Sequence, residues 1–238
     1  MRQATGSAVV AVLLLISGAC QDLDTENLNA PDEGRAITTP EDVQSLIASS
    51  FYTFFETLEG ECYPSWALGV AADEGSSSWG NCGMQDISSE PRAAFPNTTA
   101  YGYNNLVEDP WYRHYDMISS VNDGLQAIAG GVELGSGGAD NPRAIAFGKF
   151  TQALAHGYLA LQYDRAFLYT EDIDLLETEL ELQDYATIMA AAIDMFDASI
   201  TVASANTFTL PETWINGQAL TNTDLVQLAH SFAARYMT

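Results

Sequence analysis

Residues 71–81 hold the side chains best suited to binding chemistry, because acids, hydroxyls, an amide and an indole follow one another there. A sugar is bound when its C–H face lies on an aromatic ring while amide, carboxylate or guanidinium groups engage its hydroxyls. We therefore expect Trp79 to act as an aromatic platform. Its expected polar partners are Asn81, Asp73 and Arg92. The alternative is that the indole only packs against neighbouring helices.

Patterns that indicate catalysis or metal binding are missing from the sequence. His114, His156 and His230 are far apart, and none lies in a His-Glu-x-x-His motif. The sequence has no nucleophile elbow and no phosphate-binding glycine loop. The acids of residues 170–182 lack EF-hand spacing, so we expect a solvated loop instead of a calcium site. We expect no enzymatic activity, no cofactor and no metal; a remnant of a glycan hydrolase is a weaker alternative.

The segment that carries the candidate binding residues shows no helical period. Residues 60–110 are rich in Gly, Ser and Asn, with Trp66, Tyr101 and Tyr103 among them. An irregular stretch of this length is uncommon in a compact domain unless it binds a ligand or moves. We predict a long irregular ligand-binding loop, after which a helix begins at Asp109 and Pro110.

Two cysteines, Cys62 and Cys82, lie in this predicted loop. In an exported protein such a pair can form a disulfide, which for a loop of this size adds roughly 3 kcal/mol of stability. Two free, buried thiols are the competing interpretation. The sequence leaves both open.

Two apolar stripes in residues 143–203 predict the elements that organise the chain. The members of each stripe recur at steps of three and four, as on one face of an α-helix. The first stripe comprises Phe147, Phe150, Leu154, Tyr158 and Leu161, and the second comprises Tyr185, Ile188, Ala192, Phe196 and Ile200. We expect the two amphipathic helices to close as an antiparallel hairpin, with the acidic connector of residues 170–182 outside. Ala155 and Gly157 would allow a close approach between helices.

Cap signals and further stripes predict three other helices. Thr39 and Pro40 open the first, with Thr39 as N-cap. Thr221 caps the last, with Asp224 in the manner of a capping box. The first stripe is Val43, Leu46, Ile47, Phe54, Phe55 and Leu58; a middle helix carries Tyr115, Ile118, Asn122, Leu125 and Ile128 and ends at Gly130; the last has Leu225, Leu228, Phe232 and Tyr236. The fold class expected is therefore mainly all-α, built from helical hairpins.

The N-terminus has the pattern of an export signal. Arg2 precedes an apolar run over residues 8–16, and small residues then lead directly to Cys20. We expect a lipoprotein signal peptide over residues 1–19, lipidation of Cys20, and a lipidated tether over residues 20–38. Ordinary secretion with cleavage nearby is the alternative. The apolar run is shorter than the roughly 20 residues that span a bilayer.

The charge of the chain argues against nucleic acid as a partner. The net charge is −24, and because Arg2 is the only charged residue before Cys20, a chain beginning there has 7 basic and 32 acidic side chains, or −25. Phosphate binding needs lysine and arginine to displace counterions. We attribute the acidity to solubility. Lys149 is the only lysine.

These features, in this order, resemble the SusD/RagB family. They are the lipoprotein cysteine, an Asp-Leu-Asp tether ending at Pro31, the Thr-Pro-Glu-Asp-Val run from Thr39, and the run Arg-Ala-Ile-Ala-Phe-Gly-Lys-Phe-Thr-Gln-Ala-Leu-Ala-His-Gly-Tyr-Leu-Ala-Leu-Gln-Tyr-Asp-Arg-Ala from Arg143. The resemblance implies tetratricopeptide-like helical hairpins and a ligand site built mainly from loops. It also implies a surface-exposed lipoprotein of the outer membrane. Because members of that family are longer, we expect residues 39–238 to be a SusD-like helical domain truncated at the C-terminus.

The function expected is capture of nutrient oligomers, glycans first, and their delivery to a TonB-dependent outer-membrane transporter. This follows from the resemblance, which implies an oligosaccharide or peptide ligand and a SusC-like transporter as partners. The alternative function is a helical-repeat scaffold lipoprotein that binds a protein or peptide. In that case the aromatic residues of the loop would serve only packing.

Overall fold

The computed structural model describes residues 37, 39–60, 64–96, 98–215 and 217–238. The predicted signal peptide (1–19), the lipidation site Cys20 and, apart from Ile37, the predicted tether (20–38) lie outside the described residues. Residues Ile37–Thr238 form one compact unit. The unit is built mainly from helices, with two short antiparallel strand pairs, which confirms the predicted all-α class.

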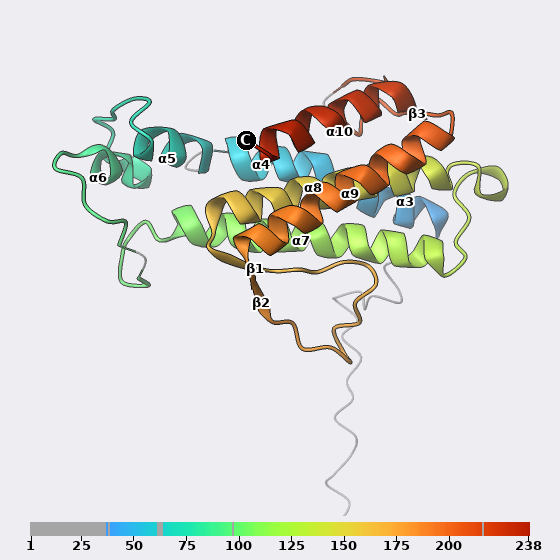
Figure 1. The fold of residues 1–238 in the computed structure, drawn as a ribbon, viewed down its shortest axis with the longest axis horizontal. Coiled ribbons are helices and arrows are strands. Elements are labelled where there is room, and N and C mark those ends of the chain that lie inside the picture. The colour runs from blue at the N-terminus through green and yellow to red at the C-terminus, as the bar shows by residue number, and fades with distance from the viewer. Residues whose placement is uncertain (1–36, 38, 61–63, 97, 216) are drawn as a thin grey trace, which may run out of the picture. The chain divides into compact units, whose positions relative to one another are not determined.

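Helix α8 (Asn141–Gln162) is the centre of this unit, with α7 (Asn105–Ala129) and α9 (Tyr185–Ala205) packed along it (Figure 1). Its residues Phe147, Phe150 and Leu154 are completely buried. So are its polar residues Gln152 and His156, because helices cover α8 on nearly every side. The prediction of an amphipathic helix was therefore wrong for α8, although Phe147, Phe150 and Leu154 of its apolar stripe lie in the core.

Two members of the predicted stripes are exposed instead of buried. Leu161 is 52% exposed in the last turn of α8, and Tyr185 is 59% exposed as the first residue of α9. Both lie at the end where the two helices separate into the connector. Both residues are helical and continue the 3.6-residue period of their stripes. They are exposed because no described helix packs against those turns.

Helices α8 and α9 are antiparallel, as predicted. The hydroxyl of Ser199, late in α9, donates to the carbonyl of Ala146, early in α8, at 2.7 Å. At the other end, the Tyr185 N–H donates to the Asp164 carbonyl at 3.1 Å. Strands β1 (Arg165–Phe167) and β2 (Leu182–Asp184) pair there and close the connector at its base.

Among the described helices, α9 is the one long and apolar enough to cross a bilayer by length and composition. Its residues Ile188, Ala192 and Phe196 are fully buried within the unit. Phe196 packs 5.8 Å from Phe150 of α8, between ring centroids. The apolar character of α9 thus serves the core of this unit.

The connector is anchored by one partly buried acid instead of lying wholly outside. Glu171, whose side chain is 14% exposed, forms an ion pair with Lys149 of α8. It also accepts a hydrogen bond from the Gln152 amide at 2.8 Å, and Gln152 donates to Asn122 of α7 at 2.5 Å. These polar side chains tie α7, α8 and the connector together.

The first predicted helix is two helices, α3 (Pro40–Ala48) and α4 (Ser50–Glu59). Thr39 caps α3 in a capping box with Asp42, as predicted from its N-cap signal. The buried stripe passes through Ser50 to Phe54, at consistent steps of three and four. Phe55 is off that stripe by one position and is 48% exposed, so its predicted burial was wrong.

Helix α7 begins at Asn105, earlier than the predicted start at Asp109, and contains Pro110. Proline lacks an N–H, so the bond that residue 110 would donate to the Leu106 carbonyl is missing. This position is in the second turn, where the helix tolerates the loss and continues. The predicted end is confirmed, because Gly130 is the C-cap.

Helix α10 (Asn222–Tyr236) completes the unit. The predicted capping box of Thr221 and Asp224 is confirmed. The Tyr236 hydroxyl donates to the Leu154 carbonyl at 3.0 Å, and the ring lies over Gly157, where an added Cβ would be only 1.9 Å from it. Gly157 thus allows the close approach predicted for it. Before α10, strands β3 (Thr209–Leu210) and β4 (Leu220–Thr221) enclose a loop whose Trp214 is buried.

Candidate functional site

Residues 64–104, here called the loop module, contain more regular structure than predicted. Helix α5 (Pro64–Ala71), the short 3-10 helix η1 (Asn81–Gly83) and helix α6 (Met84–Ser88) interrupt the irregular chain. These helices are too short for a stripe to repeat, which is why periodicity missed them. Their small apolar cluster joins Ala67, Cys82 and Met84 to Leu106 of α7.

The end of α5 places Asp73. Glu74 N–H donates to the Gly69 carbonyl at 3.0 Å, and Asp73 N–H donates to the Val70 carbonyl at 3.2 Å. This is the bond pattern of a Schellman cap, in which the residue after the helix takes a left-handed conformation. Asp73 has φ 63°, a region that aspartate tolerates better than most residues. The cap therefore fixes the backbone of Asp73, and with it the point from which the Asp73 side chain leaves the chain.

The guanidinium of Arg92 holds the loop module together. It bonds to Asp73 at 2.8 Å and to Glu90 at 2.7 Å. It also donates to the carbonyls of Val70, at 2.9 Å, and Ile87, at 2.7 Å, so it links α5, α6 and the chain after them. The hydrogen bond to Glu90 raises the pKa of Arg92 further above its ordinary value. Arginine's planar fork suits such multiple bonding.

The structure therefore brings the predicted partners Asp73 and Arg92 together, but as an ion pair. Each side chain already has an internal partner. A ligand hydroxyl would meet the remaining acceptor positions of the exposed Asp73 carboxylate more easily than the guanidinium, whose donors are engaged within the protein.

The predicted platform Trp79 lies on the surface beside a second indole. Trp79 is 43% exposed and Trp66 of α5 is 46% exposed, and their ring centroids are 6.3 Å apart with a 47° angle between planes. Asn81 is also exposed, two residues after Trp79. Sequence reasoning missed Trp66 as a site residue, because the two indoles are distant in the chain and no local pattern links them.

A tight turn presents Trp79 and Asn81. Cys82 and Gly83 both have positive φ, and a Cβ at Gly83 would lie 2.9 Å from the Tyr101 hydroxyl. Tyr103 donates to the Gly80 carbonyl at 2.9 Å. Burial, together with the hydrogen bond to Asp86, raises the pKa of Tyr101 to about 12, so this hydroxyl is protonated at neutral pH. The side chains of Tyr101 and Tyr103 thus pack against this turn and hold it in place.

Cys82 is buried and takes part in a disulfide. Its predicted partner Cys62 lies outside the described residues, so the pairing of Cys62 with Cys82 stays a prediction. A covalent tie at this point would hold the turn beside the small apolar cluster of the loop module.

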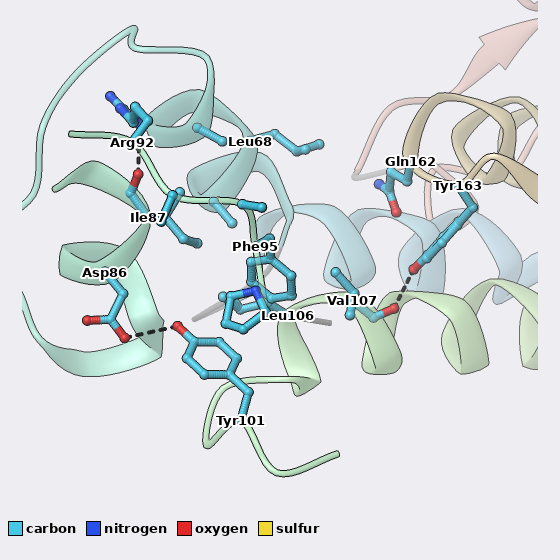
Figure 2. A pocket seen from close by; sticks show the side chains of 15 residues that line it. Leu68, Asp86, Ile87, Arg92, Phe95, Tyr101, Leu106, Val107, Gln162 and Tyr163 are labelled. Carbon is cyan, nitrogen blue, oxygen red and sulfur yellow. Dashed lines mark hydrogen bonds between the residues drawn. The ribbon is translucent and has the colours of Figure 1, made fainter. Parts of the chain in front are cut away.

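A cavity of about 650 Å³ lies between the loop module and the helices. Figure 2 shows its walls, which are mainly apolar and come from α5, α6, residues 92–96, α7 and the end of α8. Leu68, Ile87, Phe95 and Leu106 provide most of the bulk, and Gln162 and Tyr163 close one side. Sequence analysis missed the cavity, since its walls combine segments that are distant in the chain.

Two of the three histidines lie in the core, whereas His230 is exposed on α10. His114 and His156 are fully buried; burial lowers the pKa of His114 to about 3 and of His156 to about 4. Both are therefore neutral at physiological pH. In the part of the chain that the structure describes, no group of three or more His, Cys, Asp or Glu side chains could hold a metal ion.

Comparison with known proteins found no match to this chain. No family model matches the chain, and no curated protein or solved structure matches it.

Proposed function

We propose that this protein is a surface lipoprotein that captures nutrient oligomers, glycans first, and delivers them to a TonB-dependent outer-membrane transporter. The observation that supports it best is the pair of exposed indoles, Trp66 and Trp79, 6.3 Å apart between ring centroids. Two large aromatic side chains exposed side by side favour a binding surface more than one exposed ring does. The amide of Asn81 is exposed, so it can donate hydrogen bonds to sugar hydroxyls and accept hydrogen bonds from them.

The geometry suits a chain of sugars better than one compact molecule. The two rings are inclined at 47°, so the planes they present differ in orientation, which would match consecutive units of a bent oligosaccharide. The supporting turn is held by Tyr101 and Tyr103, which leaves little rearrangement to be made on binding. The resemblance to the SusD/RagB family supports the lipid anchor at Cys20 and the transporter as partner.

The test is a glycan array followed by calorimetry on the full chain. Trp66→Ala and Trp79→Ala should each weaken the best glycan about tenfold, as expected for truncated hot-spot aromatics. Asn81→Ala should weaken it less. Tyr52→Ala is the matched control, since Tyr52 is an aromatic residue 67% exposed on α4, outside the loop module in the chain. Equal losses in Tyr52→Ala and Trp79→Ala, or no glycan bound by the folded chain, would contradict the proposal.

A scaffold that binds a protein or peptide is the second candidate. The observation in its favour is the tip of the connector, where Leu176 is 94% exposed and Leu175 is 51% exposed. Apolar side chains held this far from the core are typical of contact with another protein. If this function is correct, peptide binding should occur where glycan arrays fail, and replacing both leucines by serine should abolish it.

A further inference from the structure

We propose that the cavity beneath the loop module binds a neutral, mainly apolar small molecule that carries one hydrogen-bond acceptor, which the Gln162 amide recognises. This is a second site, independent of the indole pair. At about 650 Å³ it is within the range of cavities that hold small molecules. Its walls are made of apolar side chains, among them Leu68, Ile87 and Phe95.

The polar side chains on the cavity wall are, with one exception, already paired. Tyr101 donates to Asp86 at 3.0 Å, and Tyr163 donates to the Val107 carbonyl at 2.6 Å. Arg92 is engaged with Asp73, Glu90 and two carbonyls. None of these groups offers a buried donor without a partner, although the second carboxylate oxygen of the exposed Asp86 remains as an acceptor.

The exception is Gln162, at the C-terminal end of α8. Its amide nitrogen, Nε2, is buried and has no hydrogen-bond partner among the described residues. Figure 2 shows this nitrogen on the side of the amide that faces the wall of Leu68 and Phe95. A buried donor left without a partner costs about 1–3 kcal/mol. A rotation of the Gln162 side chain would bring this nitrogen to an acceptor in the cavity and remove that penalty. The free donor thus predicts a carbonyl or ether oxygen on the ligand.

Charge considerations favour a neutral ligand. Apolar walls disfavour any formal charge, because the ion would lose its hydration. Asp86 on the wall, in a chain of net charge −24, adds repulsion against an anion. A cation would be attracted to the Asp86 carboxylate, but it would still lose hydration against the apolar walls. The occupant that fits is therefore neutral.

Three naphthalene derivatives of similar shape test this proposal by calorimetry on the full chain. They are 2-acetylnaphthalene, which has an acceptor; 2-isopropenylnaphthalene, which has none; and 2-naphthoate, which is an anion. We expect the ketone to bind about three- to tenfold more tightly than the hydrocarbon, the range of one hydrogen bond, and the anion to bind most weakly. Equal affinity for ketone and hydrocarbon, or no binding of any probe, would overturn the proposal.

Variants then locate the binding. Gln162→Met keeps the length of the side chain but loses the donor, so it should remove the preference for the ketone while the hydrocarbon still binds. Ala71→Trp, on the cavity wall, should abolish binding of all three probes. Ala72→Trp is the matched control, because Ala72 is the next residue, is exposed and is not part of the wall. A ketone preference retained in Gln162→Met would overturn the role of the amide.

A second filling variant shows whether lost binding comes from a filled cavity or from a disturbed α5. Ala94→Trp fills the cavity from residues 92–96 and should reproduce the effect of Ala71→Trp even if that variant disturbs α5. Probe binding that survives both filling variants would place the probe elsewhere and overturn the assignment. Trp79→Ala should leave probe binding unchanged, so failure of the glycan hypothesis and failure of this one are distinguishable.

Discussion

The helical core, made of α3, α4 and α7–α10, and the loop module of residues 64–104 are ordered in different ways. The core buries large apolar side chains such as Phe147, Phe150 and Phe196 completely. The loop module's own cluster contains little more than Ala67, Cys82 and Met84, and it depends on the bonds of Arg92 and a disulfide at Cys82. A segment held by hydrogen bonds, an ion pair and a disulfide needs fewer buried apolar side chains than a segment held by a hydrophobic core. Aromatic side chains of the loop module therefore stay available to solvent.

Two tryptophans give the largest expected contrast. Trp214 is 3% exposed and packs 5.1 Å from Phe147, between ring centroids, so Trp214→Ala should lower the free energy of unfolding by about 3–5 kcal/mol. Trp79→Ala removes a half-exposed ring and should change it by no more than about 0.5 kcal/mol. Urea unfolding at equilibrium measures both. Losses of similar size would show that the loop module is packed like the core.

Glycine substitutions test the same contrast through the backbone. A Cβ at Gly157 would lie 1.9 Å from the Tyr236 ring, so Gly157→Ala should cost about 3 kcal/mol, because overpacking outweighs the helix propensity gained. Gly75→Ala is the control in the loop module, where nothing lies within 4 Å of the added atom. Its effect should stay within about 0.5 kcal/mol. An unchanged urea midpoint for Gly157→Ala would contradict the close contact.

Acid should weaken the core through its buried histidines. Their pKa values, about 3 for His114 and about 4 for His156, lie below the ordinary 6.5, so the unfolded chain binds more protons than the folded chain below pH 6.5. The free energy of unfolding should keep the full contribution of the neutral histidines above that pH, and it should fall as the pH drops towards 4. The slope should approach about 1.4 kcal/mol per pH unit for each histidine.

The variant His114→Leu isolates this effect from the titration of carboxylates. It removes a ring with two buried nitrogens that have no hydrogen-bond partner among the described residues. Urea midpoints measured from pH 8 to pH 5 should depend less on pH in this variant than in the parent chain. Identical pH dependence in the two proteins would show that His114 does not contribute.

The smallest global effect, and a clear local one, is expected for Arg92→Lys. Lysine keeps the charge but loses the planar fork that reaches α5 and α6 together. Hydrogen exchange in residues 64–104 should become faster, while amides of α8 serve as an internal control and keep their protection. Faster exchange throughout the unit would mean that the loop module and the core open together.

Much of the core was predictable because its signals are local. The N-cap at Thr39, the capping box at Thr221 and the steps of three and four in α8 and α9 were predicted correctly from the sequence. The predicted burial of Phe55 was wrong, because the adjacent residues Phe54 and Phe55 cannot both lie on the same face of a helix. The sequence also cannot show that α8 is covered on all sides, which depends on helices that are distant in the chain.

The site was less predictable, because its parts meet only in three dimensions. Trp79 was expected on the surface and is exposed there, but its neighbour Trp66 comes from α5, which lacks a stripe. Arg92 was expected to face a ligand, whereas it bonds to carbonyls that no sequence pattern marks. Gln162 is brought to the cavity by the end of α8, and nothing in its local sequence distinguishes it from a solvated amide.

The ion pair of Lys149 with Glu171 has a consequence for chemical labelling. Lys149 is the only lysine in the chain, and its side chain is 19% exposed and held by the base of the connector. An amine-specific reagent can acylate it only when that pair separates and the amine loses its proton. The rate of its modification, followed by mass spectrometry, is therefore a built-in reporter of how often the connector detaches from α8, with no probe to be introduced.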